Sequence, residues 1–254
     1  MVSVEQEAPT PGAPEPLRVR AMFDGIASRY DLLNHVLSMQ MDRLWRRRAA
    51  RAAVNGTDRP RVLDLCTGTG DLAAAIRRAS PEASLVGGDF SLGMLTHAAG
   101  KAEGLRTLGA DALALPFRDR SFDAVTVAFG VRNLQDRSVG FSEMKRVLRP
   151  GGRLVVLEFA PPPGGVFGAG FKWYTNRLLP RVASFISKNP AAYRYLPESV
   201  GKFPTPPALA QEMEEAGFSA VRFENLAFKT VALHIGSAGS VGSGGTIEGA
   251  APAA

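Results

Sequence analysis

Short apolar runs alternate with amphipathic segments through the middle of the chain, between about residues 61 and 159. The runs predict strands and the amphipathic segments predict helices. We expect strands at 61–66, 84–90, 105–110, 122–129 and 152–159, and helices at 70–79, 91–102 and 137–148. Strands that alternate with helices in this way form a parallel sheet covered by helices on both faces.

The last part of the pattern differs, because two strands follow one another. A helix at 207–216 precedes apolar runs at 220–228 and 229–235, which have almost no linker between them. Two such strands must form a hairpin, so the last strand is expected to be antiparallel. A seven-stranded, mostly parallel sheet with an antiparallel last strand is typical of class I, Rossmann-like methyltransferases that use S-adenosylmethionine (SAM).

The pattern also predicts the domain boundaries. Pro and small residues dominate 1–17, and Gly, Ser and Ala dominate 237–254, so both are expected to be disordered tails of one domain at 18–236. N-terminal helices are expected at 20–37 and at the strongly basic 42–53. The stretch 161–206 is too long for a usual connection. Because it is rich in aromatic residues and follows the fifth strand, it is expected to cover a ligand crevice at the sheet edge.

Composition restricts the location and the chemistry. The chain carries a formal net charge of +6 and has one cysteine, which excludes an internal disulfide, and its histidines show no metal-ligand spacing. No run reaches the roughly 18 apolar residues of a membrane span, and no signal peptide is recognisable. We expect a cytoplasmic protein that is peripheral on the inner face of the cell membrane. The sequence does not decide whether the chain forms a homo-oligomer. The basic helix 42–53 is either a solvated face or a contact for anionic lipid.

A strand, a glycine loop and a helix follow one another at 62–76. Gly68 and Gly70 allow a nucleotide-like ligand to approach the bare backbone. Asp89 ends the next strand, where an acid is placed to accept hydrogen bonds from a ribose. The spacing also fits a dinucleotide site. However, Asp64 lies inside the first strand, where it would repel a pyrophosphate and attract the sulfonium and ammonium of SAM.

Several longer motifs resemble one family over about residues 22–236. They are Met22-Phe23-Asp24, Ser28-Arg29-Tyr30-Asp31-Leu32-Leu33-Asn34, Asp89-Phe90-Ser91, Phe129-Gly130-Val131-Arg132-Asn133, Arg149-Pro150-Gly151-Gly152 and Tyr193-Arg194-Tyr195-Leu196-Pro197-Glu198-Ser199. With these motifs the chain resembles the menaquinone/ubiquinone biosynthesis C-methyltransferases, and most closely their actinobacterial demethylmenaquinone branch. The resemblance implies SAM-dependent C-methylation of a prenylated naphthoquinol in menaquinone biosynthesis.

The resemblance also implies a cofactor site. It places SAM contacts at Thr69, at Asp89 for the ribose with Phe90 beside it, and at Asp111 and Ala112 near the adenine. Many relatives have a serine where this chain has Ala128, so only backbone groups of Ala128 are expected to serve.

Methylation at a ring carbon needs an electron-rich ring, which a deprotonated quinol provides. Arg132 and Asn133 follow the fourth strand and are our candidates for holding the quinol oxygens, with Tyr193 and Tyr195 orienting the ring. The alternatives are an Arg–carboxylate pair, an Asn helix cap and plain core packing of the tyrosines. Asp31 is a candidate base, or else a structural partner of Arg29 or Arg20.

Other function classes fit less well. The basic charge permits a nucleic-acid methyltransferase, but the fourth strand lacks the expected Asn-Pro-Pro-Tyr motif and Cys66 lies in the glycine loop. Nucleic acid is therefore not expected as a partner. A SAM-fold scaffold without activity is opposed by the intact motifs. Methylation of a ubiquinone-type benzoquinol remains the alternative, because the ring size is not readable from the sequence.

Overall fold

The computed structural model describes residues 19–20, 23–25, 27, 31, 35, 38–162, 164–165 and 198–239. The helices are α2 (Met41–Val54), α3 (Asp71–Ala79), α4 (Leu92–Ala98), α5 (Arg137–Val147) and α9 (Pro206–Glu215), with short 3-10 turns η1 (Val131–Asn133) and η3 (Ala227–Lys229). The strands are β1 (Arg61–Leu65), β2 (Ser84–Asp89), β3 (Arg106–Gly109), β4 (Phe122–Ala128), β5 (Leu148–Phe159), β6 (Ser219–Leu226) and β7 (Val231–Ser237).

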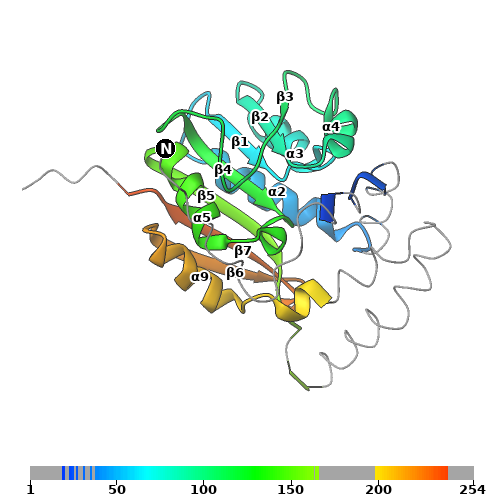
Figure 1. Ribbon diagram of the computed structural model, residues 1–254, viewed down its shortest axis with the longest axis vertical. Helices are drawn as coiled ribbons and strands as arrows, with labels where there is room; N and C mark the ends of the chain where they lie inside the picture. Colours follow the sequence, from blue (N-terminus) through cyan, green and yellow to red (C-terminus); the bar gives the residue numbers. More distant parts are fainter. Residues whose placement is uncertain are drawn as a thin grey trace, which may run out of the picture.

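All seven strands form one sheet in the order β3-β2-β1-β4-β5-β7-β6 (Figure 1). The pairs from β3 to β5 are parallel, whereas β7 is antiparallel to both β5 and β6. The predicted fold class, including the antiparallel last strand, is confirmed. β1 lies between β2 and β4, so the chain adds β2 and β3 on one side of β1 and β4 and the later strands on the other side. Such a reversal of strand order leaves a crevice at the carboxyl ends of the central strands.

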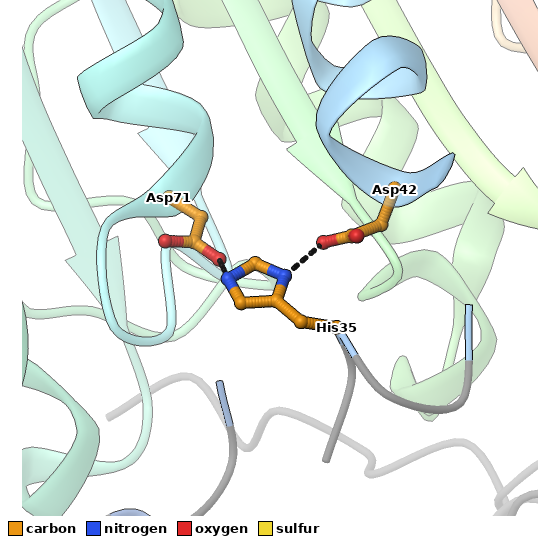
Figure 2. Close-up of side chains that lie close together, drawn as sticks. All are labelled: His35, Asp42 and Asp71. Atoms are coloured by element: carbon orange, nitrogen blue, oxygen red, sulfur yellow. Dashed lines mark hydrogen bonds and ion pairs between the residues drawn. The ribbon is translucent and has the colours of Figure 1, made fainter. Parts of the chain in front are cut away.

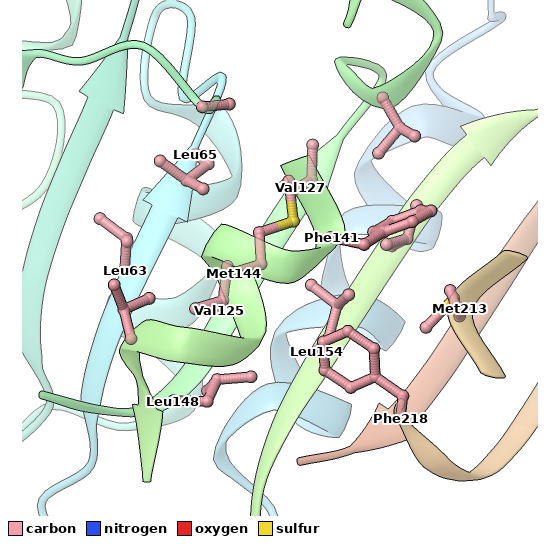
Figure 3. Close-up of a cluster of buried hydrophobic side chains, with 14 of the residues drawn as sticks. Leu63, Leu65, Val125, Val127, Phe141, Met144, Leu148, Leu154, Met213 and Phe218 are labelled. Atoms are coloured by element: carbon pink, nitrogen blue, oxygen red, sulfur yellow. The ribbon is translucent and has the colours of Figure 1, made fainter. Parts of the chain in front are cut away.

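Helices cover both faces of the sheet, and two hydrophobic cores result. Figure 3 shows one of them, in which Phe141 and Met144 of α5 and Met213 of α9 belong to the same buried cluster as Leu63 and Leu65. On the other face, residues of α2 and α3 pack on the alternate strand positions, among them Val62. Successive side chains of a strand point to opposite faces, so both faces of the central strands are buried and these strands are mostly apolar.

The clearest differences from the prediction are in β5, in α4 and between the last two strands. Residues 227–229 were predicted as strand but form η3 between β6 and β7. Strand β5 begins at Leu148 rather than at residue 152, because Leu148 pairs with Phe122 before the Arg-Pro-Gly-Gly turn. The register then shifts, and the next pair is Ala124 with Arg153. The turn is thus a bulge inside the strand, where Gly151 adopts a φ of 75° that favours glycine. Helix α4 is shorter than the predicted 91–102.

Several predicted features lie outside the described residues. They include both tails as far as residues 1–17 and 240–254, most of the first N-terminal helix, and the aromatic part of the insertion at 166–197, with Tyr193 and Tyr195. The second N-terminal helix is confirmed as α2. Within the described part of the chain, no helix is both long and apolar enough to cross a membrane.

Candidate functional site

A cavity lies at the carboxyl ends of β1, β2, β3 and β4, where the sheet order predicts a ligand site. The turns after these four strands and three N-terminal residues form its wall. The lining residues are Val19, Arg20, Phe23, Leu65, Cys66, Gly68, Asp89, Phe90, Ser91, Met94, Ala110, Asp111, Ala112, Leu113, Ala128, Phe129, Gly130, Asn133, Leu134 and Gln135. Six of the nine predicted cofactor residues are therefore brought together: Gly68, Asp89, Phe90, Asp111, Ala112 and Ala128.

The glycine loop connects β1 to α3 in the predicted way. Gly68 and Gly70 have φ values of 56° and 86°, a left-handed backbone that side chains disfavour. Gly70 is the N-cap of α3, and its N–H donates to the carbonyl of Thr67 over 2.9 Å. The loop therefore needs glycine for its backbone conformation, and it presents Gly68 to the cavity.

Asp89 joins the glycine loop to the turn after β2. Its carboxylate accepts hydrogen bonds from the backbone N–H of Gly68 and from that of Ser91, both over 2.8 Å. Burial raises the pKa of Asp89, and these two hydrogen bonds limit the rise. Asp89 nevertheless lines the cavity, at the sheet edge where the strand order predicts a ligand site.

The neighbouring wall contains an exposed aromatic side chain. Phe90 is 39% exposed, and the guanidinium carbon of Arg20 lies 5.4 Å from the centre of its ring. Across the cavity, Asp111 accepts a hydrogen bond from the N–H of Leu113 over 2.9 Å, which fixes the turn that follows β3. An aromatic side chain and a turn of small residues suit an adenine ring.

Asp64 differs from the expectation. It is 1% exposed and lies outside the described cavity wall, because its strand position directs it toward α2 and α3. The hydroxyls of Thr67 and Thr126 donate to its two oxygens over 2.6 and 2.7 Å. Burial raises its pKa to about 6, against the opposing effect of these hydrogen bonds. Asp64 therefore lies beneath the glycine loop, where any effect on a cationic ligand acts through space.

Thr69 is also placed differently. It is 3% exposed, and its hydroxyl donates to Asp31 of the N-terminal segment. The second oxygen of Asp31 pairs with Lys101, which also pairs with Asp71 over 2.7 Å. The expected partner Arg20 instead pairs with Asp24 over 3.8 Å, and Arg29 lies outside the described residues. Asp31 therefore has structural partners, Thr69 and Lys101, that the sequence did not indicate.

The same charged region includes His35, whose ring lies between two carboxylates (Figure 2). Its Nδ1 is 2.8 Å from Asp42 and its Nε2 is 3.8 Å from Asp71. This trio has the chemistry of a metal site. However, Arg46 pairs with Asp42, and Lys101 pairs with Asp71, so side chains of the protein already supply positive charge to both carboxylates.

Arg132 and Asn133 lie together in η1 but point to different surroundings. Asn133 lines the cavity. Arg132 has a side chain only 5% exposed and pairs over 2.7 Å with Glu158, which is itself buried at the end of β5. The Arg–carboxylate alternative is therefore what the structure shows. The cap of α5 is Asp136, which accepts from the N–H of Val139 over 3.0 Å.

Some residues of the site were missed by the sequence analysis. Ser91, Gln135 and Met94 line the cavity, and Glu158 supports η1. Glu158 carried a signal, as an acid at the carboxyl end of an apolar strand, and Ser91 stood in one of the motifs of the resemblance, but neither was assigned to the site. Cys66 also lines the cavity, but burial raises the pKa of its thiol well above its ordinary value, so the thiolate needed for a nucleophile is disfavoured.

Comparison with known proteins gives a consistent result. A model of the ubiE/COQ5 methyltransferase family matches residues 13–238. The chain is 54% identical to a demethylmenaquinone methyltransferase from Thermus thermophilus over 85% of this chain and 99% of the relative. It is 50% identical to one from Mycobacterium marinum, over 87% and 94%.

The solved structures share the fold at low identity. A SAM-dependent methyltransferase from Thermotoga maritima, described as a possible histamine N-methyltransferase, is 17% identical with a TM-score of 0.63, over 86% of this chain and 99% of that one. A Haemonchus contortus phosphoethanolamine N-methyltransferase in complex with SAM has a TM-score of 0.52 at 19% identity, over 69% and 37%.

Proposed function

The chain belongs to the ubiE/COQ5 methyltransferase family, and we propose on this premise that it methylates a ring carbon of demethylmenaquinol to give menaquinol. It is a SAM-dependent methyltransferase of menaquinone biosynthesis. The relatives at 46–54% identity share the name demethylmenaquinone methyltransferase, which favours a naphthoquinol over the benzoquinol alternative. The observation that carries the proposal is the cavity with Asp89 bound to the glycine loop.

The residues of the wall fit SAM. We propose that Asp89 accepts hydrogen bonds from the ribose, that Phe90, Asp111 and Ala112 surround the adenine, and that Gly68 allows the backbone to approach the cofactor. A buried carboxylate with a raised pKa favours a cationic ligand, because a positive charge stabilises its ionised form. When bound, SAM supplies an electrophilic methyl group on a sulfonium, which reacts with an electron-rich carbon.

The substrate must therefore present an electron-rich ring, and we propose that η1 provides for this. Asn133 lines the cavity, and we propose that its amide donates to a quinol oxygen, which stabilises negative charge as the hydroxyl is deprotonated. Arg132 is a positioning residue in this proposal. Its guanidinium binds Glu158 and the carbonyl of Phe129, and so fixes the turn that carries Asn133.

The redox state of the substrate tests this chemistry. Demethylmenaquinone kept reduced with dithionite should be methylated, whereas the oxidised quinone, whose ring is electron-poor, should not. Asn133→Ala should lower kcat by about 10- to 100-fold and leave the KM for SAM nearly unchanged. Asn225→Ala, an exposed position on β6, is the matched control. Equal turnover on the oxidised and reduced substrates would refute the proposal.

We also propose that the enzyme takes its prenylated substrate at a membrane surface. Helix α2 exposes Arg43, Arg47 and Arg51 together with Leu44, which is 54% exposed, whereas Arg46 of the same helix is buried. An exposed apolar side chain among cations suits an anionic lipid surface. Binding to vesicles should require anionic lipid, weaken with salt and fall in an Arg43→Gln/Arg47→Gln variant. Equal binding to neutral and anionic vesicles would contradict the proposed membrane contact.

A further inference from the structure

Asp24, in the N-terminal part of the chain, contacts the turn after β2 that contains Asp89, the proposed ligand of the ribose. One of its oxygens accepts hydrogen bonds from the hydroxyl of Ser91 and, over 3.0 Å, from the backbone N–H of Gly93. Its other oxygen lies 3.8 Å from Nε of Arg20, one helical turn earlier. Arg20 lines the cavity and lies over the ring of Phe90. Asp24 thus links the N-terminal part of the cavity wall to the turn after β2.

The contact continues to the glycine loop. Ser91 is 3% exposed, and its backbone N–H donates to Asp89 over 2.8 Å while its hydroxyl accepts from the N–H of Met94 over 3.1 Å. Asp89 in turn accepts from Gly68 over 2.8 Å. The position of the Asp89 carboxylate therefore depends on the conformation of Ser91, which Asp24 holds from the opposite side.

Gly93 permits this contact. A Cβ atom at position 93 would lie 2.6 Å from the Asp24 oxygen that accepts its hydrogen bond, closer than real Cβ contacts. Gly93 lies within α4, where alanine is the better helix former. A glycine there weakens the helix. The close approach of Asp24 explains why glycine occupies this position.

We propose that Asp24 is a positioning residue for cofactor binding, which acts through Ser91 on Asp89 and which requires glycine at position 93. The inference rests on the proposed role of Asp89 at the ribose. It concerns the lifetime and affinity of bound SAM and assigns Asp24 no contact with the reacting atoms.

The test is a double-mutant cycle read by SAM affinity. Asp24→Ala should weaken SAM binding about tenfold in calorimetry, since it removes two hydrogen bonds to a carboxylate. Asp24→Asn keeps the accepting oxygen and should stay within about threefold of the wild type. Gly93→Ala should also weaken binding about tenfold, although its cofactor-free form melts no lower than the wild type. The double variant should bind SAM no more weakly than Asp24→Ala alone, because the two changes disrupt one contact.

Kinetics and controls complete the test. The KM for SAM should rise in Asp24→Ala and in Gly93→Ala while kcat changes little. Gly201→Ala, whose added Cβ meets no atom within 4 Å, should leave SAM binding unchanged. Wild-type affinity in Gly93→Ala, or additive losses in the double variant, would overturn the inference. Asp89→Ala separates the two ideas: if it leaves affinity unchanged, the proposed ribose role fails. If only Asp89→Ala weakens binding, the role of Asp24 fails alone.

Discussion

Asp64 is a buried carboxylate whose ionisation should oppose folding at neutral pH. Burial raises its pKa from the ordinary value of 3.8 to about 6, and the hydrogen bonds from Thr126 and Thr67 only limit the rise. The folded protein therefore holds a proton on Asp64 at pH values where the unfolded chain has lost it. Between these two pKa values, the free energy of unfolding falls as the pH rises.

The size of the effect follows from the two pKa values. The interval from 3.8 to about 6 corresponds to about 3 kcal/mol once both states are ionised. About 2 kcal/mol of this should be lost between pH 4.5 and 7.5. Asp64→Asn cannot ionise, and its amide can still exchange hydrogen bonds with the two threonine hydroxyls. The stability of this variant relative to the wild type should therefore increase by about 2 kcal/mol over that range.

Urea unfolding of the cofactor-free protein, followed by tryptophan fluorescence at constant ionic strength, measures this difference. Asp58→Asn is the control, because Asp58 is exposed and lacks the burial that causes the effect. The free energy of unfolding of Asp58→Asn relative to the wild type should not show the pH-dependent increase that is expected for Asp64→Asn. Parallel stability profiles of the wild type and Asp64→Asn from pH 4.5 to 7.5 would refute the reasoning.

The same ionisation should affect SAM binding. A cationic ligand favours ionised Asp64 and lowers its pKa, so SAM affinity should rise as the pH increases through about 6. Calorimetry across this range should show a smaller rise in Asp64→Asn. Burial raises the pKa of Asp89 as well, so a bound cation favours the ionised form of Asp89 in the same direction. An unchanged pH dependence in the variant would show that Asp64 does not act on the cofactor.

Three further substitutions test the site. Asp89→Ala should weaken SAM binding by about 1.5–3 kcal/mol in calorimetry, the usual range for hydrogen bonds to a charged group; unchanged affinity would exclude it as the ribose ligand. Arg132→Ala should destabilise the fold by about 3–5 kcal/mol, because it leaves Glu158 buried without its partner. Replacing Glu158 by Gln in that variant should recover part of the loss in urea unfolding, and no recovery would contradict the role of the pair. Gly130→Ala should lower the melting temperature, because its Cβ would lie 2.3 Å from that of Cys66. Cys66→Gly should relieve that clash in the double variant, and an additive loss would refute the steric explanation.

The order of the elements and one edge of the site could be predicted from the sequence. Apolar runs spaced by amphipathic segments predicted β1 to β5, and the adjacent runs at 220–235 predicted the antiparallel end of the sheet. Asp89 could be assigned to the site because it ends a strand of a parallel sheet, whose carboxyl ends meet at one edge, whereas Asp111 was assigned only through the family resemblance. These are local patterns combined with a rule of topology, so they need no knowledge of side-chain partners.

The tertiary structure alone decided which charges meet. Glu158 reaches Arg132 because β5 lies beside β4, and Asp31 reaches Thr69 because the N-terminal segment packs on the glycine loop. Asp64 lies beneath the loop rather than in the cavity wall, because its position in β1 directs it toward α2 and α3, where the hydroxyl of Thr126 on the neighbouring strand donates to it. Each partner is more than 20 residues away in the chain. Such contacts depend on strand order and on the packing of both faces, which no local pattern of hydrophobic and polar residues encodes.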